Sequence, residues 1–315
     1  MKGGSRMKRI PHLILSAVVP PALFLSVLGI LPDTCSAERF RFVFMTDIHV
    51  TEEFDGDEGF RAAARHVNSL GPDFVITGGD MVMDALGVSF AEAVEAYDLY
   101  ASICEDLEAP VHHGIGNHEI FGLYDTTGTA RENEEYLKGM FRKRLGDGAT
   151  SSAFDHGGWH FILLDVIGFS KDGRYMGYAG KEQLRWLEDD LKGVRPGTPI
   201  VLSLHIPLVS VYGQVKRGSC TALTPGEAVL NSDEVLDLFE RHDLRLVLQG
   251  HLHVVEQIAF KGTHFVTGGA VCGAWWEGAR DGFPEGFVVV DIDGDEMDYH
   301  YETYGWEASE DLPDD

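Results

Sequence analysis

The chain has 315 residues, of which 44% are hydrophobic and 24% are charged. This composition supplies a globular core and excludes a collagen, a coiled coil or a wholly disordered chain. The length fits one α/β domain, or two domains at most. The 25 Lys and Arg stand against 51 Asp and Glu, which gives a formal net charge of −26. Because so acidic a protein repels phosphate backbones, no nucleic-acid polymer is expected as a partner.

The first residues have the pattern of an export signal. A basic head precedes an apolar run over residues 13–31, and the small residues 35–37 offer a cleavage site before Glu38. We therefore predict a signal peptide over residues 1–37 and export to the periplasm or the extracellular space. Pro20 and Pro21 interrupt the apolar run, which disfavours a permanent membrane span. An uncleaved membrane anchor is the alternative.

The rest of the chain alternates short apolar segments with helical patterns, as an α/β domain does. Buried strands are predicted at residues 41–46, 73–77, 159–164, 200–204 and 244–248. Helices are predicted at residues 58–70, 89–107, 132–145, 181–191 and 232–242, the last with Ser232 as its N-cap. Strands at 286–292 and 296–301 flank a turn at 293–295 and form a hairpin. One domain over residues 38–308 is expected, followed by an acidic tail at 309–315.

Polar side chains follow five segments of this pattern, each at the end of a predicted strand or extended segment. The five groups are Asp47-Ile48-His49, Gly78-Gly79-Asp80, Gly116-Asn117-His118-Glu119, His205 and Gly250-His251-Leu252-His253. Each group alone is common by chance, but all five in this order point to one site, because strand ends of an α/β sheet meet at one crevice. Carboxylate, amide and imidazole ligands without a thiolate suit two transition-metal ions, with Fe, Mn and Zn all compatible.

With these motifs the chain resembles the calcineurin-like metallophosphoesterases, from about Phe40 to at least Thr267. The resemblance implies an α/β fold in which two mixed β-sheets pack between helices, an αββα sandwich with a dimetal site at the strand ends. It assigns the first metal to Asp47, His49 and His253, the second to Asn117, His205 and His251, and the bridge to Asp80. It makes His118 a catalytic residue that assists the leaving group after a metal-bridging hydroxide attacks phosphorus.

Departures from two subgroups of this family favour a phosphodiesterase. No arginine follows Asp80 closely, as it does in protein serine/threonine phosphatases, and Met83 stands where purple acid phosphatases have a tyrosine ligand. The Asp-x-His motif is similar to the phosphodiesterase-like branch, which includes cyclic-nucleotide and glycerophosphodiester hydrolases. An exported dimetal phosphodiesterase acting on a small phosphate ester is the leading hypothesis. A phosphomonoesterase with the same site and a non-catalytic, metal-stabilised binding protein are the alternatives.

Two segments are candidates for the substrate wall. The glycine-rich segment 268–286 contains Trp275, Trp276 and Arg280, which would stack on a base or sugar and meet a phosphate. The alternative is that both tryptophans pack on the edge of the sheet. The second segment, 209–232, contains Tyr212, Lys216 and Arg217.

The sequence leaves several residues without a functional assignment. Glu119 receives no firm role, and the histidines outside the motifs are expected to be structural or exposed. Three cysteines remain after the predicted cleavage, Cys104, Cys220 and Cys272, and their spacing matches no zinc motif. An odd number in an exported protein permits one disulfide and one free thiol. The pairing and the oligomeric state stay open.

Overall fold

Two mixed β-sheets form the centre of the computed structural model, which describes residues 39–308. The first sheet has the strand order β13-β12-β1-β2-β3 and the second the order β10-β11-β9-β8-β5-β4. The first contains β1 (Arg39–Met45), β2 (Phe74–Thr77), β3 (Val111–His113), β12 (Gly286–Asp293) and β13 (Glu296–Thr303). The second contains β4 (Ser152–His156), β5 (Trp159–Leu163), β8 (Pro199–Ser203), β9 (Asp243–Gln249), β10 (Val255–Phe260) and β11 (Thr263–Gly268).

The strands at the middle of each sheet run parallel, which brings their carboxyl ends to one edge. Strands β1, β2 and β3 pair in parallel in the first sheet, as do β5, β8, β9 and β11 in the second. Antiparallel strands close the outer positions, where β12, β13, β10 and β4 lie. A separate hairpin joins β6 (Ile167–Phe169) to β7 (Tyr175–Gly177). Loops that leave the parallel strands therefore gather at the same edge.

The two sheets pack face to face through an aromatic core. Alternate residues of β1 point into this layer, and Phe42 stacks on Phe74 with ring centroids 5.1 Å apart. Phe42 also meets Phe161 of the opposite sheet edge-on, at 5.4 Å. The intervening Val43 and Met45 point the other way and belong to a second buried cluster, beneath a helix. The fold class predicted from the resemblance is confirmed.

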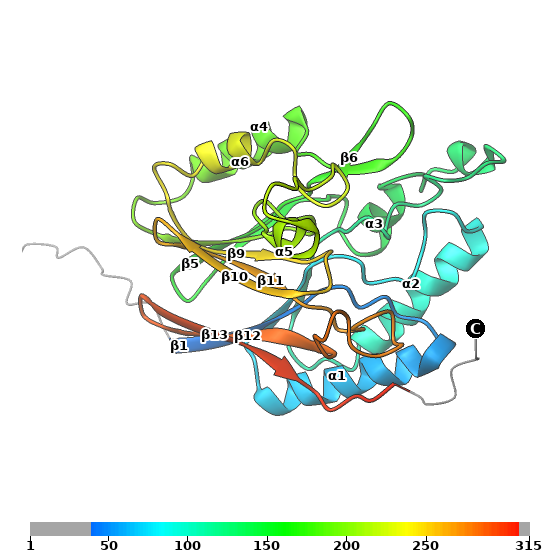
Figure 1. Cartoon of the computed structure of the whole chain (residues 1–315), viewed down its shortest axis with the longest axis horizontal. Coiled ribbons are helices and arrows are strands. Elements are labelled where there is room, and N and C mark those ends of the chain that lie inside the picture. Colours follow the sequence, from blue (N-terminus) through cyan, green and yellow to red (C-terminus); the bar gives the residue numbers. More distant parts are fainter. Residues whose placement is uncertain (1–38, 309–315) are drawn as a thin grey trace, which may run out of the picture. The chain divides into compact units, whose positions relative to one another are not determined.

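Helices cover the outer face of each sheet (Figure 1). On the first sheet lie α1 (Gly56–Leu70) and α2 (Phe90–Cys104), and on the second α4 (Lys181–Leu191) and α6 (Ser232–Asp237). Short elements complete the list: η1 (Glu53–Asp55), η2 (Thr129–Glu132), α3 (Gly139–Arg144) and α5 (Tyr212–Arg217). Between residues 39 and 308, no helix has both the length and the apolar character that crossing a membrane requires.

Three predicted helices differ from the structure. The helix expected at 132–145 is limited to α3, because Leu137 takes a left-handed φ of 55° and bridges to Phe121. The helix expected at 232–242 ends at Asp237, and Asn231, not Ser232, occupies its N-cap. The Asn231 side chain does not cap that helix, because it pairs with the backbone N–H and C=O of Ala179. The helix expected at 89–107 ends early, at Cys104.

The segments outside the described range stay predictions. These are the signal peptide at residues 1–37 and the acidic tail at 309–315. Within residues 39–308, Cys104, Cys220 and Cys272 are all free thiols. Cys272 is buried, Cys104 is half-buried and Cys220 is exposed, so the disulfide that the sequence left open is not formed among these three.

Candidate metal centre

The predicted metal ligands converge at the carboxyl ends of the parallel strands. Asp47 and His49 follow β1, Asp80 follows β2, Asn117 follows β3, His205 follows β8, and His251 and His253 follow β9. All are buried except His251, which is half-buried. Five segments far apart in the sequence therefore supply one buried cluster of nitrogen and oxygen donors.

Asp80 lies in the middle of this cluster. Its Oδ2 atom is 3.1 Å from His205 Nε2 and 3.6 Å from His49 Nε2. Its other oxygen, Oδ1, accepts a hydrogen bond of 2.8 Å from the backbone N–H of His118. One carboxylate thus faces histidines of both predicted metal sites, which is the placement a bridging ligand needs.

The remaining side chains form two groups on either side of Asp80. In the first group, His253 Nε2 is 3.3 Å from Asp47 Oδ1, and the His49 and His253 rings lie 5.1 Å apart. In the second group, His205 Nε2 is 3.2 Å from both Asn117 Oδ1 and His251 Nδ1. These are the two sets that the resemblance assigned to two metals. Their role as ligands stays a prediction.

Backbone carbonyls fix the orientation of the histidines. His205 Nδ1 donates to Gly78 O at 2.9 Å, and His253 Nδ1 donates to Gly273 O at 2.7 Å. His251 uses Nε2 instead, which donates to the carbonyl of Gly226 at 2.7 Å. Because each carbonyl binds the protonated ring nitrogen, the other nitrogen turns its lone pair toward the cluster. This arrangement fits histidines that hold a metal.

His49 provides a second test of that fit. Its side chain is buried, and neither ring nitrogen has a hydrogen-bond partner within the described chain. Leaving buried polar atoms unpaired is unfavourable by about 1–3 kcal/mol each. A cation between His49, Asp80 and Asp47 would satisfy this orphaned imidazole, so the residues present fit a metal ion.

The buried carboxylates make the cluster attractive to positive charge. Burial alone would raise the pKa of Asp47, but His253 and His205 outweigh it and lower that pKa to about 2. Burial would lower the pKa of His205, but Asp80 and Asp47 raise it to about 9. Burial and the neighbouring His205 lower the pKa of His251 to about 4. The carboxylates therefore keep positive charge on His205, whereas His251 beside it is neutral near pH 7.

Five of the predicted ligands have left-handed backbone conformations, which orient their side chains. The φ angles are 53° at Asp47, 45° at His49, 52° at Asp80, 74° at His251 and 53° at His253. Residues with a Cβ rarely adopt these angles, and such strain persists where surrounding contacts impose it. Here the first two loops hold each other, because Asp47 N–H donates to Gly79 O and His49 N–H donates to Asp80 O.

Glu119, which the sequence left without a role, joins two of these loops. It is completely buried, and its carboxylate accepts hydrogen bonds from the backbone N–H groups of Gly116, Asp80, Met81 and Val82, at 2.7–3.2 Å. Burial and the nearby Asp80 raise its pKa to about 7. Glu119 is thus a positioning residue for the loops that carry Asp80 and Asn117.

His118 lies beside the cluster and is more open than the predicted ligands. Its side chain is 24% exposed, and its Nδ1 donates to Met83 O at 2.6 Å. Its Nε2 is 4.0 Å from Asp80 Oδ2, and its ring meets the His49 ring at 4.5 Å. The Nε2 atom is therefore outside hydrogen-bond distance of Asp80, and the ring is partly exposed beside the cluster.

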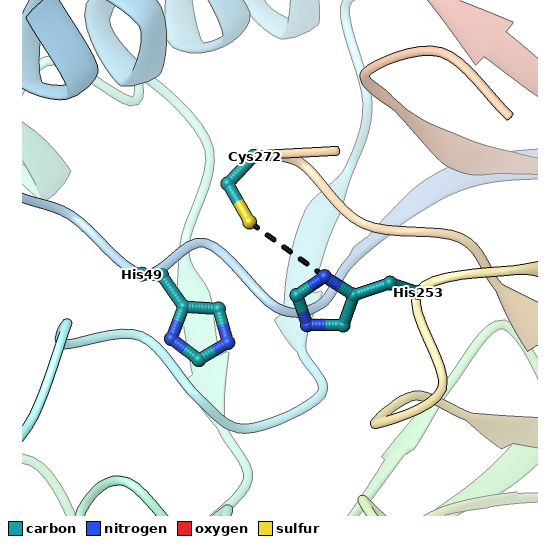
Figure 2. A group of neighbouring side chains, drawn as sticks. All are labelled: His49, His253 and Cys272. Carbon is teal, nitrogen blue, oxygen red and sulfur yellow. Dashed lines mark hydrogen bonds between the residues drawn. The ribbon is translucent and has the colours of Figure 1, made fainter. Parts of the chain in front are cut away.

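A loop at residues 270–278, here called the tryptophan loop, covers the first group. Its Cys272 thiol lies 4.0 Å from Nδ1 of His253 (Figure 2). That nitrogen already donates to the carbonyl of Gly273, so the thiol lies behind the histidine ring. The five sequence motifs did not include Cys272. In the sequence, the feature that could have drawn attention to Cys272 is its position within the segment 268–286, which is rich in glycine and contains both tryptophans.

The two tryptophans of this loop have different surroundings. Trp276 is fully buried, and its Nε1 donates to the carbonyl of His49 at 2.9 Å, so this side chain supports His49 and has no surface to offer a substrate. Trp275 is half-buried, with its ring 4.7 Å from His253 and 6.1 Å from His49. The Arg280 guanidinium lies over the Trp275 ring at 5.2 Å. Trp275 and Arg280 are thus at the site, whereas Trp276 is in the core.

The second candidate segment, 209–232, contacts both the first segment and the predicted ligand His251. Tyr212 Oη and Lys216 Nζ both bind the carboxylate of Asp281, and Arg217 pairs with Glu227. Gly226 of the same segment supplies the carbonyl to which His251 donates. Tyr212, Lys216 and Arg217 are therefore each bound to a carboxylate of the chain itself.

The chain belongs to the calcineurin-like phosphoesterase family. The family model for calcineurin-like phosphoesterase matches residues 40–255, and the model described as the C terminal of calcineurin-like phosphoesterase matches residues 266–312. Such a hydrolase acts on phosphoric esters with the help of metal ions, and the family implies a dinuclear metal site. The recognition made from the five motifs is confirmed.

Individual relatives agree with this membership. A probable cyclic nucleotide phosphodiesterase of Xenorhabdus bovienii is 22% identical over 271 residues, which cover 81% of this chain and 96% of the relative. A dimetal phosphatase from Danio rerio has the same fold, with a TM-score of 0.60, 15% identity and coverage of 84% and 96%. Purple acid phosphatase from yellow lupin seeds has a TM-score of 0.59, 13% identity and coverage of 87% of this chain and 53% of its own.

Proposed function

We propose that this protein is an exported phosphodiesterase that uses two transition-metal ions and His118. The observation that carries the proposal is the pair of donor groups on either side of Asp80, with His118 Nε2 left facing the same space. The motif departures at Met83 and after Asp80 favour the diesterase branch. The name of the Xenorhabdus relative, a probable cyclic nucleotide phosphodiesterase, supports the same substrate class.

Each part of the site has a task in this reaction. Two cations, when bound, neutralise the anionic phosphate and supply a nucleophile near neutral pH. Asp80 holds the two halves of the site at one fixed separation, and the carbonyl partners of His205, His251 and His253 keep their rings turned inward. His118, fixed through Nδ1 on Met83 O, donates a proton from Nε2 to the leaving oxygen when its imidazole is charged.

The substrate test compares a diester with a monoester. Purified protein, reloaded separately with Mn, Zn and Fe, would be assayed on bis(p-nitrophenyl) phosphate and on p-nitrophenyl phosphate. We expect metal-dependent turnover that favours the diester and falls about 100-fold or more in His118→Ala. His300→Ala, which removes an exposed histidine of β13, is the matched control. Preference for the monoester would replace the diesterase with a phosphatase, and bound metals without turnover of either ester would indicate a narrow pocket or a non-catalytic protein.

Export is a separate part of the proposal. It is supported by the basic head, the apolar run and the small residues before Glu38. Expression of the full chain in a bacterial host, followed by cell fractionation and mass spectrometry of the intact product, tests it. A periplasmic or secreted product that begins at Glu38 is expected. A full-length product in the membrane fraction would support the uncleaved anchor instead.

A further inference from the structure

The turn at residues 280–283 holds a cation close to the metal centre. Arg280 and Phe283 exchange two backbone hydrogen bonds, with Arg280 N–H to Phe283 O at 2.9 Å and Phe283 N–H to Arg280 O at 2.8 Å. Asp281 and Gly282 between them have φ angles of 51° and 88°, as a tight Asp-Gly turn requires. The backbone around Arg280 is therefore rigid.

The acidic neighbour of Arg280 does not neutralise it. The Asp281 carboxylate binds Tyr212 Oη at 3.1 Å and Lys216 Nζ at 2.7 Å, which links the turn to α5. Within residues 39–308, no carboxylate forms an ion pair with Arg280, and its buried Nε has no hydrogen-bond partner. The charges of Lys216 and Asp281 cancel each other, so the positive charge of Arg280 has no paired negative charge.

The Arg280 guanidinium and the candidate ligands His253 and His49 lie near the same side chain, the Trp275 ring. The guanidinium lies over the Trp275 ring, 5.2 Å from its centroid, and the imidazole centroids of His253 and His49 lie 4.7 Å and 6.1 Å from that of the same ring. Arg280 is only half-buried, so its remaining N–H donors can reach a bound molecule. In a chain with a net charge of −26, an unpaired cation beside an anion-processing site favours a ligand that carries more negative charge.

We propose that Trp275 and Arg280 form a second anion subsite, which selects diesters with a further carboxylate or phosphate group on one alcohol arm. This inference rests on the proposed function and deepens it, because it names a charged subclass of phosphodiesters as substrates. The guanidinium donates to the second anion, and the exposed part of the Trp275 ring contacts the planar or apolar part of the arm. Arginine suits this task because its planar fork matches carboxylate and phosphate oxygens.

The test uses two substrates that differ by one charge on each arm. Bis(4-carboxyphenyl) phosphate and bis(4-carbamoylphenyl) phosphate place the same group on both arms, so either arm can reach Arg280. The ratio of their kcat/KM values is measured for wild type, Arg280→Gln and Arg280→Lys. Because a charge-assisted hydrogen bond is worth about tenfold or more, we expect Arg280→Gln to lower the carboxylate-to-carbamoyl ratio by about tenfold. Arg280→Lys should retain part of the preference. Arg195→Gln, which removes an exposed cation after α4, should leave the ratio as in wild type. An equal ratio in wild type and Arg280→Gln would overturn the subsite.

A binding measurement separates failure of the subsite from failure of the proposed function. The free arm, 4-hydroxybenzoate, is titrated into metal-loaded protein while tryptophan emission is recorded, with 4-hydroxybenzamide as the neutral comparison. Wild type should bind the anion about tenfold more tightly than Arg280→Gln, and Trp275→Phe should lose the emission change. If neither diester is hydrolysed, the proposed function fails, and this titration still decides the subsite. Equal affinity in wild type and Arg280→Gln would overturn it.

Discussion

Substitution of Glu119 tests how the candidate centre is assembled. This residue lies behind the predicted ligands and holds their loops by accepting hydrogen bonds from backbone N–H groups. Its Oε1 atom accepts from Met81 and Val82, and its Oε2 atom accepts from Asp80 and Gly116. Glu119→Ala removes all four acceptor contacts. Glu119→Gln keeps one oxygen acceptor and turns an NH₂ donor toward the other two N–H groups.

The expected loss of stability follows from these four contacts. A buried N–H left without a partner costs about 1–3 kcal/mol, and effects of neighbours in one network are less than additive where water or relaxation intervenes. We expect Glu119→Ala to lower the free energy of unfolding by about 3–5 kcal/mol, a large share of the about 5–15 kcal/mol of a typical protein. Glu119→Gln should lower it by about half as much, because two of the four donors keep their partner.

Urea unfolding with and without added metal measures this loss, and metal analysis of the purified variants shows whether the centre still forms. Both variants should retain less metal than wild type, since the Asp80 loop loses its support. Glu95→Ala removes an exposed glutamate of α2 and should stay within about 0.5 kcal/mol of wild type. A Glu119→Ala protein that matched wild type in both unfolding and metal content would refute the positioning role.

Three further outcomes are expected. Trp276→Phe keeps the buried ring but loses the N–H that holds the His49 carbonyl, so metal affinity in a calorimetric titration should fall about 10-fold or more while the fold is retained. Burial lowers the pKa of His160, but hydrogen bonds to Asp190 and Asp155 raise it above 6.5. Its charged form thus stabilises the fold below pH 6.5, and this contribution is lost as pH rises through the folded pKa. His160→Gln should therefore be less stable than wild type by about 0.5–1 kcal/mol at acidic pH and nearly equal at pH about 9, with thermal unfolding at both pH values as the check. Chelation should lower the melting temperature of the loaded protein, by a loss of about 2.7 kcal/mol if metal had been present at about 100 times its Kd. An unchanged melting temperature would contradict bound metal.

The central strands of the fold were predictable because a strand that is buried on both faces appears in the sequence as a continuous apolar run. The five strands expected from apolar runs agree with β1, β2, β5, β8 and β9 within two residues at each end. Strands β4, β10 and β11 were missed because they lie toward the edges or mix polar and apolar residues, as in Val255–Phe260. The helix expected at 132–145 failed for a tertiary reason, since the pairing of Leu137 with Phe121 overrides its helical pattern.

The composition of the site was predictable, but its support was not. The motif residues could be found because ligand-binding side chains of an α/β sheet gather at the carboxyl ends of its strands. Glu119 adjoins a motif, yet its partners Met81 and Val82 come from a different loop, and no local spacing reveals that contact. The same holds for the positive φ angles at Asp47 and Asp80, which depend on hydrogen bonds between loops.

The tryptophan loop explains why residues near the end of the chain matter to a motif near its start. Cys272 N–H donates to Asp47 O at 3.2 Å, and the Trp276 indole donates to His49 O. The indole can approach so closely because the first turns of α1 have glycine where a side chain would collide: a Cβ on Gly59 would lie 2.3 Å from the ring, and one on Gly56 would lie 2.7 Å from it. At an interior helix position such as that of Gly59, glycine normally weakens the helix by about 1 kcal/mol relative to alanine. Its presence at both positions is accounted for by this contact, through which α1 and the tryptophan loop together hold the loop of Asp47 and His49 in its left-handed conformation.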